Sequence, residues 1–548
     1  MAEAVDYLII GGGSAGCVLA NRLSEDPAVR VCLLEAGPPA WNPLIRVPVG
    51  ITGLMRSRRF NWAYRTEAQS RLDNRRLFWP RGRTLGGSSA INAMCYTRGH
   101  PADYDAWEAD GATGWNWKAL LPYFRRSERF AGGADAWHGD SGLLSVEPLR
   151  TFNPFCQAFV DAAVNAGIPY NPDFNGATQT GVGPYHVMQE GGRRCSNARA
   201  YLHPARQRRN LTVITGALVH QLLQEGDRIN GVLYSKGRHR YSVSAGTEVI
   251  LAAGAVGTPH ILQLSGIGSP RELEAAGVAV RHDLPGVGAN LQDHLDVSVV
   301  WSTRDRRGIS FHPTYLPRGV RGLWEYLRHR RGELCSNLAE AGAFVHSRAA
   351  GEIPDLQMHF LPAIEDEHGL DLRRTIAGYG YTLRTCFLRP HSRGRIGLHT
   401  GQPQMAPRID PDYLSVDTDA ERLVDALERA REILAQSPIA AIGDVELKPG
   451  SDVQGRAALR RYVAAHAETI YHPVGTCRMG VDGDSVVDPQ LRVHGLRGLR
   501  VVDASVFPRL IGGNTNAPVT AVAERAADLI RGGDNVAELR GFADAVNA

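Results

Sequence analysis

Three glycines near the N-terminus have the spacing of a turn that approaches a phosphate group. An apolar, β-rich run at 5–10 leads into Gly11-Gly12-Gly13-Ser14-Ala15-Gly16, and a run with helical spacing follows. In such a strand–turn–helix unit, Gly11 permits the tight turn and Gly13 lets the backbone approach a pyrophosphate. Gly16 allows close packing of the helix, whose N-terminus favours the phosphate charge. The segment therefore predicts a nucleotide site rather than a plain glycine turn.

An acid follows where a ribose contact is expected. A second apolar run, 30–34, is typical of a buried strand and ends in Glu35. A carboxylate at this place can accept hydrogen bonds from ribose hydroxyls, which favours an unphosphorylated ribose. The glycine turn and the acid together indicate a dinucleotide, but they do not distinguish FAD from NAD.

Two further segments have the composition of ligand-binding loops. Residues 81–92 form a second glycine–serine loop, whose backbone N–H groups and hydroxyls could hold the same dinucleotide a second time. Residues 499–505 resemble a strand that ends in an acid, and the polar run 512–516 follows a turn.

A second strand-to-helix crossover is expected in the middle of the chain. The buried strand at 249–253 leads into a segment with helical spacing. Thr258 is the predicted N-cap of this helix, Pro259 its first residue and Gly266 its stop.

Composition limits the class of protein. The chain has 548 residues, of which 43% are hydrophobic and 22% charged, and its 60 glycines follow no collagen-like period. A soluble globular protein with two ordinary domains, or one large discontinuous unit, is expected. The net charge of +4 is too small to suggest nucleic acid as a partner.

Cysteine spacing and hydropathy indicate the cellular compartment in which the protein is expected. The eight cysteines are scattered without a C-x-x-C pair, so neither a metal site nor a disulfide framework is predicted, and a reducing cytoplasm fits. No basic segment followed by an apolar run opens the chain, and no apolar stretch approaches the length that spans a bilayer.

These segments resemble the signatures of the glucose-methanol-choline (GMC) flavoprotein oxidoreductases. The glycine turn, the internal signatures at 82–92 and 254–268, and the C-terminal motifs around His472 and Asn514 all match, over nearly the whole chain. Within the family the chain is most similar to the membrane-associated, FAD-dependent primary alcohol dehydrogenases of alkane-degrading bacteria. This closer likeness is carried by residues 78–82, 317–323, 336–342 and 378–383.

The resemblance implies an α/β fold, α+β overall, in which a discontinuous Rossmann-like FAD-binding domain joins an antiparallel-sheet substrate domain. The expected FAD-binding segments are 1–155, 195–300 and 456–548, and the expected substrate-binding segments are 156–194 and 301–455. In the substrate domain, 355–360 alternates in the manner of a half-buried strand, and 393–398 resembles another strand of the same sheet.

The resemblance also implies a histidine and an amide as the catalytic pair. Oxidising an alcohol with a flavin requires a base for the hydroxyl proton, and histidine suits that task near neutral pH. His472, whose backbone Pro473 stiffens, lies in the segment that resembles the catalytic loop and is the predicted base. The second catalytic position maps onto Asn514, whose amide can hold the substrate oxygen. Asn516 is the competing assignment, and both amides could instead satisfy the turn backbone.

The cofactor that the resemblance implies is FAD. Some family members attach it through a histidine in the second signature, but the aligned residue here is Ile91, so noncovalent FAD is expected. By resemblance, Asn92 and Ala93 border the flavin ring, Val219 lines the adenine pocket, and Asp503 with Ala504 contacts the ribityl chain and pyrophosphate. The alternatives are core packing for Val219 and a turn cap for Asp503. The predicted cofactor-binding residues are Gly11, Gly13, Ser14, Ala15, Gly16, Glu35, Ala36, Arg83, Gly87, Ser88, Asn92, Ala93, Val219, Asp503, Ala504, Asn514 and Thr515.

A basic amphipathic segment at 315–334 admits two interpretations. If it is helical, its apolar residues form one stripe and its arginines flank that stripe. Such a helix can lie on anionic lipid, or it can pack its apolar side on its own domain. In the first case the electron acceptor could be a membrane quinone. The residues are Val320, Leu323, Trp324 and Leu327 in the stripe, with Arg318, Arg321, Arg328, Arg330 and Arg331.

The predicted function is FAD-dependent oxidation of primary, medium-chain aliphatic alcohols to aldehydes, with electrons passed to a quinone-like acceptor. The expected location is the cytoplasm, with peripheral contact to the inner face of the membrane as an option. Choline oxidation is the alternative, and it would require a carboxylate and aromatic faces around a quaternary ammonium, for which Glu340 and Trp324 are candidates. A hydroxynitrile lyase that binds FAD without redox turnover, and a nonenzymatic FAD-binding protein, are disfavoured.

Overall fold

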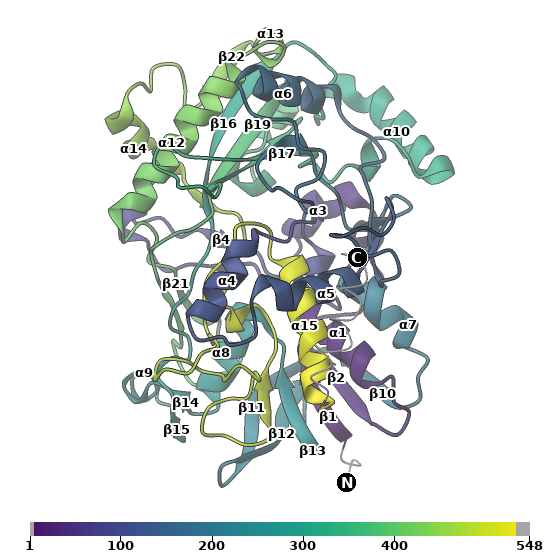
Figure 1. Ribbon diagram of the computed structural model, residues 1–548, viewed down its shortest axis with the longest axis vertical. Coiled ribbons are helices and arrows are strands. Elements are labelled where there is room, and N and C mark those ends of the chain that lie inside the picture. Colours follow the sequence, from purple (N-terminus) through teal and green to yellow (C-terminus); the bar gives the residue numbers. More distant parts are fainter. Residues whose placement is uncertain (1–4, 533–548) are drawn as a thin grey trace.

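Two large sheets divide the protein into two halves, shown one above the other in Figure 1. The computed structural model describes residues 5–532. The lower half in this view contains both the first and the last described helices, so distant parts of the chain meet there.

The first sheet has a parallel core, as a dinucleotide-binding fold requires. Strand order runs β10-β2-β1-β13-β12-β11, and β24 pairs in parallel with β13. The antiparallel part of this sheet is at one end, where β12 pairs antiparallel with both β11 and β13. The strands are β1 (Val5–Ile10), β2 (Val31–Glu35), β10 (Leu211–Thr215), β11 (Ala217–Glu225), β12 (Arg228–Lys236), β13 (His239–Leu251) and β24 (Leu499–Val501).

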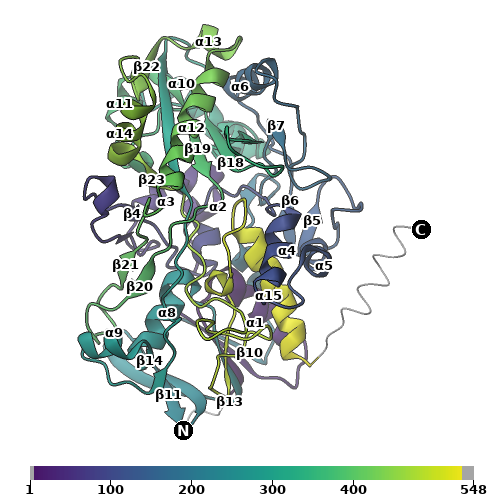
Figure 2. The same ribbon diagram turned by 60° about the vertical axis from the view of Figure 1, so that its left-hand side comes forward.

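Helices α1 (Ser14–Leu23) and α15 (Asn516–Ile530) pack against each other beside this sheet, although nearly the whole chain separates them. Figure 2 shows them together in a second view. Their apolar faces share one core with β1 and β2, in which Val18 and Val522 have no exposed surface. The other helices near this sheet are α4 (Pro101–Ala109), α5 (Trp117–Ser127), α7 (His203–Ala205), α8 (Gly254–Leu264) and α9 (Pro270–Ala275).

The second sheet is antiparallel and carries its own core. Its order is β22-β16-β19-β18-β17-β7, with β23 paired to β16, and helices α6, α12 and α14 contribute to its core. The strands are β7 (Gly181–Pro184), β16 (Leu295–Thr303), β17 (Ala341–Val345), β18 (Leu356–Leu361), β19 (Tyr379–Phe387), β22 (Val445–Lys448) and β23 (Glu468–Thr469). The helices of this half are α6 (Pro154–Asn165), α10 (Leu316–His329), α11 (Arg373–Ala377), α12 (Asp417–Leu434), α13 (Ile439–Ile442) and α14 (Arg456–His466).

The predicted start of the central crossover helix is wrong. Helix α8 begins at Gly254, so Thr258 and Pro259 lie inside it. Proline lacks the N–H that would bond the carbonyl four residues earlier, here that of Ala255, and the Thr476 hydroxyl donates to that carbonyl instead at 2.7 Å. This external donor explains why the proline is tolerated in the helix. The predicted stop is confirmed, because Gly266 follows the helix with φ of +79°.

Two predictions for the second sheet also need correction. Strand β18 is buried on both faces rather than one, since Phe360 stacks on Phe159 of α6 while His359 lines a cavity on the other side. The segment 393–398 does form a strand, β20 (Arg395–Gly397), but β20 pairs with β21 (Arg408–Asp410) in a separate two-stranded sheet.

The two-domain division stays a prediction, and two of its boundaries conflict with the sheets. The boundary at 300 cuts through β16, which pairs with β19 along its length. Helix α14, which begins at the other boundary, packs its Leu459 and Val463 into the second core. Both segments therefore belong with the half that contains the second sheet, while residues 1–4 and 533–548 of the predicted FAD-binding domain lie outside the described residues.

Candidate active site

A cavity of about 920 Å³ lies where the two halves meet. Ile10 of β1 lines it from one side and His359 of β18 from the other. Every residue predicted for cofactor binding or catalysis lines this cavity, except Gly16. The sequence motifs, dispersed over the chain, therefore converge on one site.

Close backbone contacts require glycine at Gly11 and Gly16 of the first turn. A Cβ on Gly11, whose φ is +104°, would stand 2.5 Å from the Ala252 carbonyl oxygen. A Cβ on Gly16 would stand 1.9 Å from the Gly11 carbonyl oxygen, so Gly16 serves helix packing and has no need to face the cavity. A Cβ on Gly87 would meet Gly13 Cα at 2.7 Å, which brings the two glycine loops into contact. This cradle at the start of α1 fits a pyrophosphate.

Glu35 is held in place at the end of β2. Its two carboxylate oxygens accept from the backbone N–H groups of Gly12 at 2.8 Å and Gly37 at 2.7 Å. Burial raises the pKa of Glu35 to about 7, against the lowering effect of these two bonds. Each oxygen retains a lone pair for a further donor, so the residue fits the predicted ribose contact.

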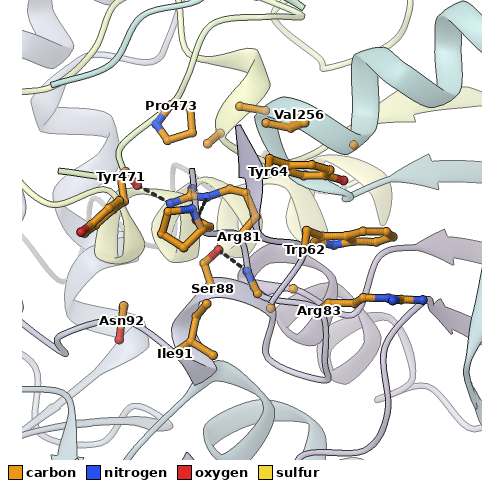
Figure 3. Close-up of a pocket in the computed structure, with 18 of the residues that line it drawn as sticks. Trp62, Tyr64, Arg81, Arg83, Ser88, Ile91, Asn92, Val256, Tyr471 and Pro473 are labelled. Carbon is orange, nitrogen blue, oxygen red and sulfur yellow. Dashed lines mark hydrogen bonds between the residues drawn. The ribbon is translucent and has the colours of Figure 1, made fainter. Parts of the chain in front are cut away.

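The second glycine–serine loop presents Ile91 and Asn92 to the cavity (Figure 3). Arg194 fixes this part of the loop by donating to the backbone oxygen of Asn92 at 2.5 Å and to its side-chain oxygen at 2.9 Å. Ser88 accepts from the Gly82 N–H at 3.2 Å. The Ile91 side chain offers no atom that could bond covalently to a flavin.

For Val219 and Asp503 the sequence left two interpretations, a cofactor contact or a structural role, and both residues line the cavity while they also have a structural role. Val219 belongs to the first hydrophobic core and also lines the cavity. Asp503 caps a short 3₁₀ helix through the Ser505 N–H and also accepts from the Gly254 N–H at 2.8 Å and the Thr258 hydroxyl at 2.6 Å. It therefore ties the C-terminal segment to the start of α8 while it borders the cavity.

His472 and Asn514 meet in the part of the cavity next to the second sheet. The Asn514 amide nitrogen lies 3.2 Å from His472 Nε2. Asn516 points elsewhere: its oxygen accepts from Ser14 at 2.6 Å, and its nitrogen lies 3.1 Å from the Asn197 oxygen. The geometry thus favours Asn514 over Asn516 as the partner of the histidine.

The loop that carries His472 is fixed on several sides. Tyr471 has φ of +74°, a conformation that is unfavourable for a tyrosine. Its N–H donates to Thr469 Oγ1 at 2.8 Å, and its carbonyl accepts from Arg81 at 2.6 Å (Figure 3). The His472 N–H donates to the Asp293 carboxylate at 2.7 Å. These bonds hold the ring that follows at a defined place in the cavity.

Burial keeps the His472 ring neutral. Desolvation holds the pKa of His472 well below its usual value of 6.5, and the nearby groups His294, His359 and Arg81 lower it further. A neutral imidazole keeps a lone pair that can take a proton.

Sequence motifs did not reveal the residues that orient this pair. Thr97 and Gln357 each donate to the Asn514 oxygen at 3.1 Å, and His294 Nδ1 lies 3.0 Å from His472 Nδ1. They come from three separate segments without a recognisable spacing to His472. The signal that could have found His294 is its place beside Asp293, but the contact with His472 appears only in the fold.

The candidates for a choline site are not brought together. Glu340 is buried outside the cavity lining, where it accepts from Ser336 Oγ and the Asn153 N–H, both at 2.6 Å. Trp324 stands on α10 with 61% of its surface exposed. This pair therefore cannot enclose a quaternary ammonium.

The amphipathic segment forms helix α10, and its apolar stripe faces outward. Leu316, Val320, Leu323, Trp324 and Leu327 are between 47% and 68% exposed. The buried residues of the helix lie on its other side, at Gly322 and Tyr326. The interpretation in which the stripe packs on its own domain is therefore wrong. Within 5–532, no helix combines the length and apolar character needed to cross a bilayer.

The chain matches a known family over most of its length. A family model described as GMC oxidoreductase matches residues 5–296, and the C-terminal model of the same description matches 390–523. The chain is a GMC oxidoreductase. The predicted family and fold class are confirmed, and the cofactor of this GMC oxidoreductase is FAD.

Relatives of this GMC oxidoreductase include enzymes that act on different alcohols. It is 49% identical over 530 residues to an alcohol dehydrogenase (acceptor) of Pseudomonas putida, covering 96% of this chain and 95% of the relative. It is 42% identical to the mitochondrial choline dehydrogenase of Homo sapiens, covering 96% and 89%. The crystal structure of pyridoxine 4-oxidase from Mesorbium loti aligns with a TM-score of 0.87 at 35% identity, covering 96% of this chain and 99% of that one.

Proposed function

We propose that the protein oxidises primary, medium-chain aliphatic alcohols to aldehydes and passes the electrons to a quinone-like acceptor. The observation that carries this proposal is the convergence of His472 Nε2 and the Asn514 amide at 3.2 Å within the cavity that the FAD-binding loops line. The likeness to an alcohol dehydrogenase that uses an acceptor supports the reaction type.

The proposed reaction divides the work between the cofactor and two side chains. Bound FAD supplies the acceptor for the hydride that leaves the alcohol carbon. His472 Nε2 takes the hydroxyl proton, because the lowered pKa of this histidine leaves its ring neutral. The Asn514 amide donates to the substrate oxygen, on which negative charge develops as the proton leaves. The alcohol oxygen is thus received between Nε2 and the amide.

The Asn514 amide is oriented for this task before substrate binds. Its oxygen accepts from Thr97 and Gln357, so its nitrogen must face His472. A donor fixed in this way costs little reorganisation during the reaction.

Noncovalent binding of FAD is part of the same proposal. The presence of Ile91 at the cavity supports it, because this side chain has no atom that could bond covalently to the flavin.

The apolar part of the cavity lining supports an aliphatic substrate. Apolar side chains that could contact an alkyl chain reach the cavity from several segments. They include Ile51, Met55, Leu338, Leu361 and Ile470. These apolar side chains suit an uncharged alkyl chain.

Peripheral binding to the inner face of the membrane completes the proposal. The exposed stripe of α10 offers apolar side chains to the acyl boundary, and Arg321, Arg328 and Arg331 beside it suit anionic headgroups. A quinone dissolved in that membrane would then be close to the reduced enzyme.

The test is anaerobic mixing of the FAD-loaded protein with 1-octanol, and separately with choline, while the visible absorption of the oxidised flavin is followed. We expect octanol to bleach the flavin and choline to leave it oxidised. Slow recovery after air is admitted, and fast recovery with a soluble quinone, are expected of a dehydrogenase. Bleaching by choline alone would overturn the substrate assignment, and release of cyanide from a hydroxynitrile without bleaching would indicate a lyase.

A further inference from the structure

A second buried histidine, His294, contacts the proposed base His472. His294 directly precedes β16 and has no exposed surface. Its Nδ1 lies 3.0 Å from His472 Nδ1, and the two rings are nearly perpendicular, at 89°. Of this pair, only His472 lines the cavity. His294 therefore acts on any substrate only through the neighbouring ring.

The other nitrogen of His294 has a partner that fixes its proton. Nε2 lies 3.0 Å from the carbonyl oxygen of Leu388. A carbonyl can only accept, so Nε2 must carry a hydrogen. Burial lowers the pKa of His294 to about 3, and the ring therefore has a single proton at neutral pH. Its Nδ1 is then an acceptor that faces His472.

This acceptor determines the tautomer of His472. Since His294 Nδ1 holds no hydrogen, the 3.0 Å contact requires the hydrogen on His472 Nδ1. The lone pair of the neutral His472 ring is then on Nε2, the nitrogen that faces Asn514.

An independent chain of bonds reaches the same conclusion from the opposite side. Thr97 and Gln357 donate to the Asn514 oxygen, so the amide nitrogen donates toward His472 Nε2 at 3.2 Å. A donor at this place again requires a bare Nε2. The Leu388 carbonyl at one end and the two donors at the other thus impose one consistent proton arrangement.

We propose that His294 is a positioning residue that holds His472 in the tautomer with its lone pair on Nε2. The inference rests on the proposed function, in which Nε2 takes the hydroxyl proton. When Nε2 gains that proton, the Nδ1 hydrogen of His472 stays on its bond to His294, whose Nδ1 lone pair stabilises the new positive charge on the His472 ring. A neutral imidazole thus serves where a carboxylate orients the histidine in other enzymes.

Two substitutions at position 294 with side chains of similar shape distinguish the positioning role from a role in packing alone. In His294→Asn the side-chain oxygen can occupy the place of Nδ1 and accept from His472, whereas His294→Leu has a similar outline without an acceptor. The limiting rate and the half-saturating concentration for anaerobic flavin reduction by 1-octanol are measured for each variant and the wild type. His282→Leu is the matched control, because His282 Nε2 also lies 2.9 Å from a carbonyl, that of His494, away from the cavity.

The Leu variant is expected to retain FAD and to lose roughly 100-fold or more in limiting rate, since the buried Nδ1 hydrogen of His472 then has no acceptor and the tautomer with its lone pair on Nε2 loses this stabilisation. Its half-saturating concentration should change less than about twofold, because only the chemical step depends on the tautomer. The Asn variant should recover most of the lost rate. The His282→Leu control should reduce like the wild type.

Three outcomes would overturn the inference. These are a Leu variant with the wild-type limiting rate, Asn and Leu variants that are equally slow, and a loss confined to the half-saturating concentration. If the Leu variant loses FAD, His294→Gln replaces it, because this polar side chain carries its oxygen one bond too far to serve as the acceptor and should also be slow. A wild type that no alcohol reduces would refute the proposed function itself, and the positioning role with it.

Discussion

Asn514 and Asn516 illustrate how two identical side chains acquire different tasks. The Asn514 amide faces His472, while Asn516 joins Ser14 of the first glycine turn to Asn197. The sequence showed two amides in one loop, and the resemblance favoured Asn514 with Asn516 as the competing assignment. The fold separates them because α15 begins at Asn516, which turns that side chain toward α1.

Replacing each amide should therefore produce a different defect. Asn514→Ala removes a donor to the substrate oxygen and should lower the rate of flavin reduction per bound FAD by roughly 100-fold, as loss of one preorganised donor does. Asn516→Ala removes the partner of Ser14 and should weaken FAD retention. Flavin content after gel filtration and anaerobic single-turnover rates measure the two effects. A wild-type reduction rate in the Asn514 variant would remove this amide from the mechanism.

Residues with a fixed local spacing were predictable, and residues that act across the fold were not. The glycine turn and Glu35 form a short unit whose spacing follows from phosphate and ribose geometry. Thr97, His294 and Gln357 belong to segments that meet only when the second sheet is placed over the first. Their roles depend on tertiary contacts that no local pattern encodes.

At the scale of elements, α10 differs from the helices that cover the second sheet. Helix α12 buries its apolar side in the core of that half, whereas α10 exposes its stripe and packs through Gly322 and Tyr326. Exposed large apolar side chains that lie together usually mark a contact surface. The arginines beside them provide the charge that an anionic bilayer attracts.

Binding to vesicles tests this surface. The protein should sediment with vesicles that contain phosphatidylglycerol, less so at high salt, because headgroup attraction is screened. Leu323→Glu and Trp324→Glu should each cut the bound fraction by about tenfold or more, since each loses about 1.5–3 kcal/mol of apolar burial. Val481→Glu is the control, as Val481 is 70% exposed and lies outside α10. Equal loss in the control, or no loss in the α10 variants, would exclude the helix as the docking element.

Element predictions succeeded where hydrophobic pattern alone decides. Strands β1 and β2 were predicted within one residue because their buried runs end at a turn and an acid. The start of α8 was missed because Thr476, remote in sequence, donates to the carbonyl that Pro259 leaves free. The partner of β20 was missed because sequence reveals a strand and not its neighbour.

At the scale of the whole molecule, one cavity combines loops from both halves. The glycine turns, Glu35 and Val219 come from the first half, while His359 and Leu361 of β18 close the cavity from the second. The discontinuous arrangement was predictable, since the nucleotide motifs are spread along the chain. The shape of the substrate region was not, because it depends on how the two sheets meet.

The central claim is that His472, in this shared cavity, takes the hydroxyl proton of an alcohol while FAD is bound. The most direct measurement is anaerobic flavin reduction by 1-octanol in the wild type and in His472→Gln, from pH 5 to pH 9.

Because burial places the pKa of His472 well below 6.5, the base stays neutral above that pH. Wild-type reduction should therefore be flat from about pH 6.5 upward and should fall only as the ring becomes protonated at lower pH. The account predicts that His472→Gln keeps its FAD, reduces at least about 1,000-fold more slowly at neutral pH and loses this acid limb. Reduction of the variant at the wild-type rate, with the same pH profile, would contradict it.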